Sequence, residues 1–98
     1  MALEIVWSPT AQQKRKEILS YWKERNSSDS YSRKLNSLFI KAVKQLSKFP
    51  YIGRSSDIEG VRVKIVRDYL LFYQVKENAV EILTIWDSRQ DPEELKIN

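Results

Sequence analysis

The stretch that decides the fold is GVRVKIVRDYLLFYQVKENAVEILTIWDSR (residues 60–89). It reads as three β-strands. In the first strand Val61, Val63 and Ile65 alternate with two cations. An extended backbone would send the aliphatic side chains to one face and the cations, Arg62 and Lys64, to the other. We therefore expect this strand to have one core face and one basic face.

The two segments that follow are residues 69–75 and 80–86, both continuous runs of apolar, β-branched and aromatic side chains. Such runs are typical of strands covered on both faces or lying at the centre of a sheet. Residues 76–78 form a polar gap of hairpin length, and residues 67–68 are expected as the preceding turn, although they include no glycine. We predict a three-stranded meander that ends before Pro92, because proline cannot continue a ladder.

The first half of the chain predicts a strand and two helices. Residues 3–7 are a short apolar run. Ser8 is a good N-cap and Pro9 is favoured at the first helical position, so a helix is expected from here to about Arg25. A second helix is predicted up to Pro50, because apolar side chains recur on one side of a 3.6-residue helix. These side chains are Tyr31, Leu35, Leu38, Phe39, Ala42, Leu46 and Phe49.

The helices and strands together predict an α+β fold. Two long helices joined by a few polar residues should form an antiparallel hairpin whose shared apolar side packs on the sheet. Residues 51–59 are expected as a surface loop, and residues 93–95 as a single helical turn. The length of 98 residues and the 42% hydrophobic content favour one domain covering residues 1–98.

Composition excludes several chemistries. The chain has no cysteine and no histidine, which excludes disulfides, thiolate metal sites and a Ser-His triad. We therefore expect no metal ion and no cofactor. The net charge of +4 permits an acidic partner without requiring one. The chain has no long apolar segment and no basic leader at its N-terminus, so no membrane partner and a cytoplasmic location are expected.

Several short motifs, taken in order, resemble the RelE/ParE toxin superfamily over nearly the whole chain. They are Trp7-Ser8-Pro9-Thr10-Ala11, Phe49-Pro50-Tyr51-Ile52-Gly53-Arg54, Val61-Arg62, Tyr73-Gln74-Val75 and Trp86-Asp87-Ser88-Arg89-Gln90-Asp91-Pro92. The resemblance implies an N-terminal strand and a two-helix antiparallel hairpin packed on a mainly antiparallel twisted sheet, with a C-terminal three-stranded meander.

The resemblance also implies a function. Members of the superfamily are growth-inhibiting toxins of type II toxin-antitoxin modules, which are linked to plasmid stabilisation, and an acidic cognate antitoxin protein neutralises them. RelE-like members are similar to ribosome-dependent mRNA endonucleases (mRNA interferases), whereas ParE-like members act on DNA gyrase. The long helical hairpin favours the ParE-like branch slightly. The alternatives are a RelE-like nuclease that acts on mRNA at the ribosome, or an inactive relative that only binds antitoxin.

The RelE-like catalytic pattern matches this chain only in part. The resemblance implies catalytic roles for Arg62, Lys64 and Arg89 if the chain is RelE-like. The pattern expects an arginine at Leu70 and a tyrosine near Leu95, and both positions are apolar here. RNA cleavage needs a base, a donor to the leaving oxygen and cations at the phosphate. The chain offers the cations without an evident proton-transfer pair, so enzymatic activity stays an open question, and any such activity would be metal-independent.

Two further cations are candidates for target binding. Arg54 lies in the predicted loop after the second helix, and Arg67 lies in the predicted turn of the meander. In an arbitrary protein, cations that alternate along a strand more often form the solvated face of a sheet than a phosphate site. The resemblance makes the two interpretations of Arg62 and Lys64 about equally favoured.

Overall fold

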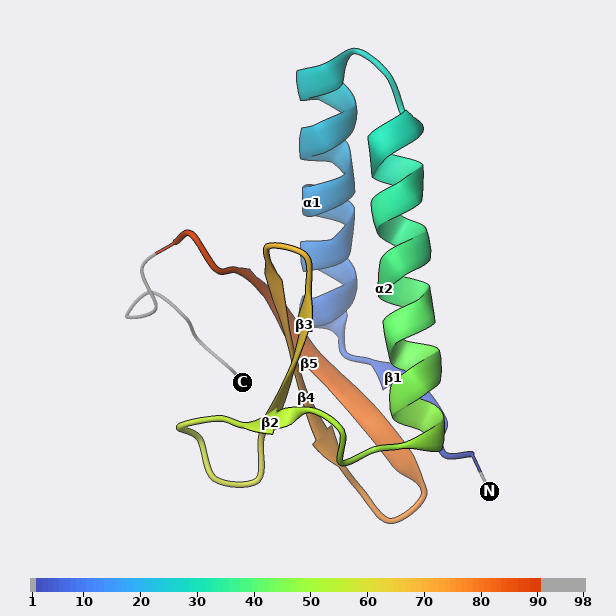
Figure 1. The fold of residues 1–98 in the computed structure, drawn as a ribbon, viewed down its shortest axis with the longest axis vertical. Helices are drawn as coiled ribbons and strands as arrows, with labels where there is room; N and C mark the ends of the chain where they lie inside the picture. The colour runs from blue at the N-terminus through green and yellow to red at the C-terminus, as the bar shows by residue number, and fades with distance from the viewer. Residues whose placement is uncertain (1, 91–98) are drawn as a thin grey trace.

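The computed structural model describes residues 2–90. The elements in chain order are β1 (Glu4–Trp7), α1 (Pro9–Asn26), α2 (Ser30–Lys48), β2 (Arg54–Ser55), β3 (Arg62–Val66), β4 (Tyr69–Val75) and β5 (Ala79–Asp87). They form a five-stranded sheet of order β1-β5-β4-β3-β2, in which β1 pairs parallel with β5 and the other pairs are antiparallel. The predicted α+β fold, with its N-terminal strand, helical hairpin and meander, is confirmed (Figure 1).

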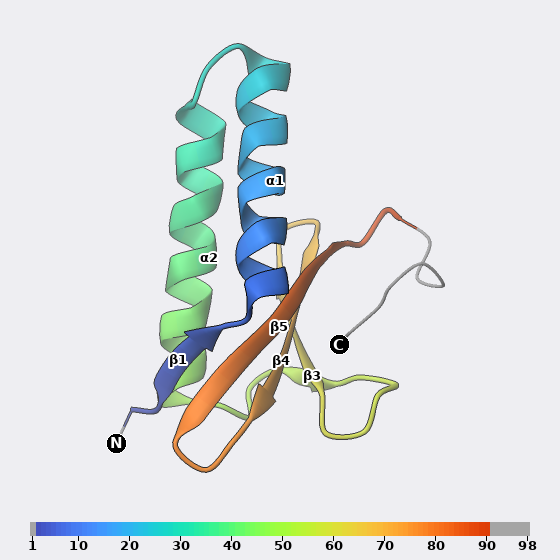
Figure 2. The same ribbon diagram turned by 180° about the vertical axis from the view of Figure 1, so that it is seen from behind.

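Local signals explain where the helices begin and end. The Ser8 side chain accepts a hydrogen bond from the backbone N–H of Ala11, and proline occupies the first helical position of α1. This helix ends at Ser27, whose φ of 49° lies in the left-handed region. Both helices lie on one side of the sheet, and the end of the hairpin that carries their connecting loop projects beyond it (Figures 1 and 2).

The main core lies between the hairpin and the sheet. Its buried members from the helices are Ala11, Leu35, Phe39, Ala42, Val43 and Leu46, and those from the sheet include Val66, Tyr69, Leu71, Tyr73, Val80, Ile82 and Ile85. The predicted apolar side of α2 is therefore confirmed, with one exception. Phe49 is 61% exposed, because α2 ends at Lys48 and the helical period no longer directs this side chain to the core.

A second, smaller core lies on the opposite side of the sheet. It contains Val61, Phe72 and Trp86, packed with Val63, Leu70 and Leu83. The pairing of β4 with β5 skips Leu83, so this residue forms a bulge that shifts the alternation along β5. The sheet therefore has apolar side chains on both faces, as the continuous apolar runs of β4 and β5 predict.

This second core corrects the interpretation of β3. Arg62 pairs with Tyr73 and Lys64 pairs with Leu71, and both partners belong to the main core. Since paired residues of an antiparallel ladder share a face, the cations lie on the side that carries the helices. The expectation of a single core face is wrong, and Ile65, placed there by alternation, is 48% exposed.

Two further details of the connections matter for the site. Residues 54–55 form the short edge strand β2, whereas the sequence predicted loop throughout residues 51–59. The turn between β3 and β4 lies at residues 67–68 as predicted, and Arg67 supplies the positive φ of 57°. The predicted turn of helix at residues 93–95 lies outside the described residues. Neither described helix is long and apolar enough to cross a membrane.

Candidate functional site

Arg62, the first candidate site residue, is hydrogen-bonded within the protein. Its Nε donates to the backbone oxygen of Gly53 at 3.1 Å, and its Nη2 donates to the same oxygen at 2.8 Å. The same Nη2 also donates to the backbone oxygen of Tyr51 at 3.1 Å, and the guanidinium carbon lies 5.5 Å from the centroid of the Tyr51 ring. The guanidinium therefore holds the chain that leaves α2.

Tyr73, on β4, also holds the segment that follows α2. Its buried hydroxyl accepts a hydrogen bond from the Gly53 N–H at 3.0 Å and donates one to the Pro50 backbone oxygen at 2.8 Å. A Cβ on Gly53 would lie 2.5 Å from the Tyr73 hydroxyl oxygen and 2.7 Å from the backbone oxygen of Val63, so only glycine allows this approach. We call residues 49–54 the exit loop.

The exit loop exposes large apolar side chains. Phe49 is 61% exposed, Tyr51 66% and Ile52 48%. Arg54, a candidate target-binding residue, follows at the end of the loop and is exposed on β2. The loop thus combines a fixed backbone with an apolar surface.

Lys64 and Arg67 lie in a different place, in a hollow of about 230 Å³ that we call the α2–β3 groove. Its lining residues are Leu38, Lys41, Ala42, Gln45, Lys64, Ile65, Val66 and Arg67. Three of these residues are cationic and none is acidic. In the described chain β2 pairs only with Arg62 and Val63, so residues 64–66 have no partner strand on this edge.

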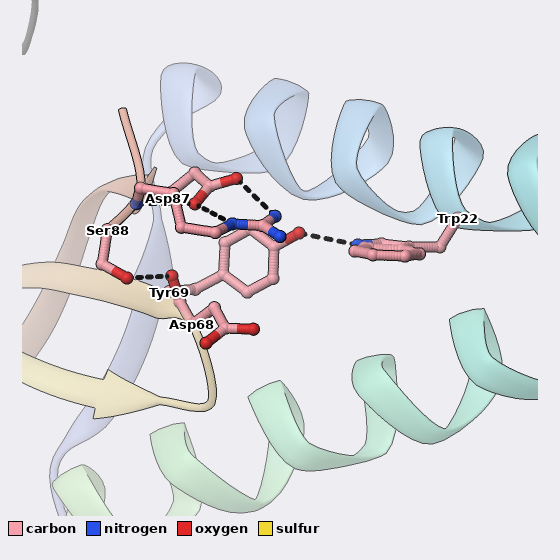
Figure 3. Close-up of polar contacts among 6 residues, drawn as sticks. Trp22, Asp68, Tyr69, Asp87 and Ser88 are labelled. Carbon is pink, nitrogen blue, oxygen red and sulfur yellow. Dashed lines mark hydrogen bonds and ion pairs between the residues drawn. The ribbon is translucent and has the colours of Figure 1, made fainter. Parts of the chain in front are cut away.

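Arg89, two residues after the end of β5, is bound to the carboxylate of Asp87. Figure 3 shows Asp87 beside Tyr69, its partner on β4. The Nε and Nη2 of Arg89 donate to the two carboxylate oxygens of Asp87 at 3.0 and 2.8 Å. The guanidinium carbon lies 6.0 Å from the ring centroid of Trp22, whose Nε1 donates to the Tyr69 hydroxyl at 2.7 Å. These contacts join the start of β4 and the segment after β5 to α1, about one turn before this helix ends.

The electrostatics of this cluster follow from its contacts. The hydrogen bonds from Arg89 hold the pKa of Asp87 below its ordinary value, and the carboxylate in turn raises the pKa of the guanidinium. Burial raises the pKa of Tyr69, although the hydrogen bond from Trp22 acts in the opposite direction. All of these shifts favour the ordinary charge states at neutral pH, so none of the groups is prepared for proton transfer.

The structure does not bring all three candidate catalytic cations together, because Arg62 and Lys64 share one face of β3 whereas Arg89 lies elsewhere. Arg62 pairs with Tyr73 towards the end of β4, whereas Arg89 follows Asp87, which pairs with Tyr69 at the start of β4. Leu70, at the position where the RelE-like pattern has an arginine, packs in the second core, and the position near Leu95 lies outside the described residues. No group of acidic residues in residues 2–90 could hold a metal ion.

Sequence reasoning missed three contributors to these sites. Gly53 and Tyr73 anchor the exit loop across twenty residues of sequence. Asp87 could have been found, since a carboxylate two residues before an arginine in the segment that ends a strand is a plausible ion pair.

Comparisons with known proteins agree with this architecture. A family model described as "ParE toxin of type II toxin-antitoxin system, parDE" matches residues 5–92. A solved structure described as "Chromosomal ParDE TA system from P. aeruginosa" is similar with a TM-score of 0.75 and 20% sequence identity, covering 86% of this chain and 94% of that chain. No curated protein sequence gives a significant match. The chain belongs to the family of ParE toxins of type II toxin-antitoxin systems.

Proposed function

We propose that this toxin acts in the cytoplasm by inhibiting DNA gyrase and that an acidic cognate antitoxin neutralises it. Membership of the ParE family supports a type II toxin. The observation that favours gyrase over RNA as the target is the dispersal of Arg62 and Arg89 to opposite ends of β4. Cleavage of RNA would need such cations to converge on one phosphate, beside groups that can transfer a proton.

The contacts of each arginine support the same proposal. The Nε and Nη2 groups of Arg62 already donate to backbone oxygens, and Arg89 donates to Asp87 through two nitrogens. A guanidinium whose donors are taken in this way has few left for a phosphate. Lys64 is the remaining candidate, and a single ammonium lacks both a base and an acid partner.

The α2–β3 groove is the site that we propose for the antitoxin. Its apolar floor includes Leu38 and Val66, and among the lining residues within 2–90 three are cationic and none is acidic. The edge of β3 at residues 64–66, which no strand within residues 2–90 pairs with, can accept an added strand. An acidic segment laid along β3 would satisfy this edge and neutralise Lys41, Lys64 and Arg67.

The target is tested with purified components. We expect the toxin to inhibit supercoiling by DNA gyrase and to leave cell-free translation unaffected. The Arg89→Ala variant separates the two functions, since a nuclease that used this cation would lose activity whereas gyrase inhibition should persist. Loss of translation with intact supercoiling would reject gyrase as the target.

The antitoxin site is tested by charge reversal. We expect Lys64→Glu with Arg67→Glu to weaken antitoxin binding by roughly ten-fold or more and to reduce its salt dependence, because rim charges steer association. The matched control is Lys16→Glu with Lys23→Glu, which makes the same change in net charge on the exposed face of α1. Equal weakening in both double variants would show a non-specific effect of net charge and would reject the groove.

A further inference from the structure

The exit loop is anchored by more side-chain contacts than a surface connection requires. Arg62 donates to the backbone oxygens of Tyr51 and Gly53, while Tyr73 binds the Gly53 N–H and the oxygen of Pro50. Most loops have few such contacts and are correspondingly mobile. This loop is held by two side chains of the central sheet, so its conformation is set before any partner arrives.

The same loop leaves Phe49, Tyr51 and Ile52 largely in water. Exposed apolar side chains are ordinary when scattered singly, but three within four residues form a patch. Burial of these side chains in the core would stabilise the folded protein more than their exposure does. Aromatic side chains presented on a preorganised backbone are typical anchors of protein interfaces, because little conformational entropy is lost when they bind.

We propose that the exit loop is the surface through which this toxin docks on its protein target, with Phe49 and Tyr51 inserted into an apolar pocket of that target. This inference rests on the proposed function, under which the target is DNA gyrase. Arg62 is then a positioning residue, since it holds the loop in the docking conformation rather than contacting a phosphate.

The charges around the loop separate a folded protein target from the acidic antitoxin. Lys48 precedes the loop, Arg54 ends it, and Asp57 and Glu59 follow it, so the charges near the loop are of both signs. An acidic segment would prefer the α2–β3 groove, which lies beside residues 64–67 rather than at the Arg62 end of β3. Mixed charge around an aromatic centre fits the polar rim of a protein interface.

The contacts also argue against single-stranded nucleic acid as the occupant. Such sites combine stacking aromatics with cations that are free to bind the backbone phosphates. The cation stacked on Tyr51 is Arg62, and its Nε and Nη2 are directed at backbone oxygens. The cation that lies over the aromatic surface is therefore largely committed to the protein's own backbone, and the other cations near the loop, Lys48 and Arg54, are accompanied by Asp57 and Glu59.

The test uses the full chain in a gyrase supercoiling assay. We expect Phe49→Ser with Tyr51→Ser to raise the concentration for half-inhibition by roughly ten-fold or more, as truncation of central aromatic anchors does. The fold should persist, because both side chains are already more than half exposed. The matched control is Val6→Thr, an exposed apolar residue on β1 at the other edge of the sheet, which should change inhibition by less than about two-fold.

The positioning role has its own measurement. We expect Arg62→Ala to weaken gyrase inhibition and to speed hydrogen exchange at the Gly53 amide, while Arg62→Lys restores part of both. Melting temperatures and antitoxin affinity are recorded for every variant. A residue needed only for global stability would lower the melting temperature without a selective rise in exchange at residue 53.

The outcomes are distinguishable. If the unaltered toxin fails to inhibit gyrase, the proposed target is wrong and the docking assignment falls with it. If the unaltered toxin inhibits and the double serine variant inhibits equally well, the docking inference alone is overturned. A selective loss of antitoxin affinity, or of affinity for a labelled single-stranded oligonucleotide, with gyrase inhibition intact would assign the loop to that ligand and would also overturn the inference.

Discussion

Removing one hydroxyl group tests how the exit loop is held. In Tyr73→Phe the ring stays in the core, so no large cavity forms, and only the group that binds Gly53 and Pro50 is lost. The Gly53 N–H is left without its hydrogen-bond acceptor at a buried position. A buried donor without an acceptor costs about 1–3 kcal/mol, and we expect a loss of about 2 kcal/mol in the free energy of unfolding.

Urea unfolding measures this loss. A protein of this size has a slope of about 1–2 kcal/mol per molar urea, so the midpoint should fall by about 1–2 M. The matched control is Tyr51→Phe, in which a hydroxyl is likewise removed but from a residue that is 66% exposed, and it should stay within about 0.5 kcal/mol of the unaltered protein. Hydrogen exchange at the Gly53 amide should accelerate only in Tyr73→Phe.

A double-mutant cycle adds a second check on the same contact. A Cβ on Gly53 would lie 2.5 Å from the Tyr73 hydroxyl oxygen, so Gly53→Ala should destabilise the protein. Removal of that hydroxyl relieves part of the clash, so the double variant should lose about 1 kcal/mol less than the sum of the two single losses. A Tyr73→Phe variant with unchanged stability and exchange, or a strictly additive cycle, would refute the anchoring that we derive from these distances.

Three further predictions concern other contacts. Trp22→Phe removes the donor to the Tyr69 hydroxyl and should cost about 1 kcal/mol in urea unfolding. Arg89→Gln should raise the pKa of Asp87 towards its ordinary value near 3.8, measured by NMR titration. Because the folded-state pKa of Asp87 is depressed, the ion pair with Arg89 stabilises the unaltered protein at neutral pH, and this contribution is lost as the pH falls through that pKa. The free energies of unfolding of the variant and of the unaltered protein should therefore converge in acid. Ser8→Ala removes the N-cap of α1 and should cost about 1 kcal/mol, measured as a fall in melting temperature.

The fold was predictable where local signals were strong. The Ser8-Pro9 pair marks the start of α1, the helical period marks α2, and two long apolar runs mark β4 and β5. Strand β2 could not be predicted, because its two polar residues carry no pattern of their own and pair only because the edge of β3 is available. The alternation of side chains along β3 also could not predict which face of this strand meets the helices, because both faces of the sheet pack apolar side chains.

The site was less predictable than the fold, for a physical reason. Alternation on β3 places Arg62 on a face, but its role depends on a backbone oxygen nine residues earlier, at Gly53, whose position follows from the tertiary fold. Likewise, the sequence around Tyr73 indicates only a buried position in an apolar strand. The contact of its hydroxyl with the exit loop follows from the tertiary fold. Patterns of residue type identify cations and aromatics, whereas hydrogen-bond partners decide what those groups are free to do.

The chemistry of Arg62 yields a last discriminating prediction. At a phosphate site that uses only the positive charge, lysine can replace arginine because an ammonium binds phosphate as a point charge, so Arg62→Lys would then retain much of its function. A clamp on backbone oxygens depends on the planar fork of the guanidinium, since Nε and Nη2 together bind Gly53 while Nη2 reaches Tyr51. An ammonium cannot reproduce that geometry, and we therefore expect Arg62→Lys to fall between Arg62→Ala and the unaltered protein in both amide exchange at Gly53 and gyrase inhibition. Full activity in the lysine variant, with exchange at Gly53 as fast as in the alanine variant, would show that charge matters at this position and that the clamp does not.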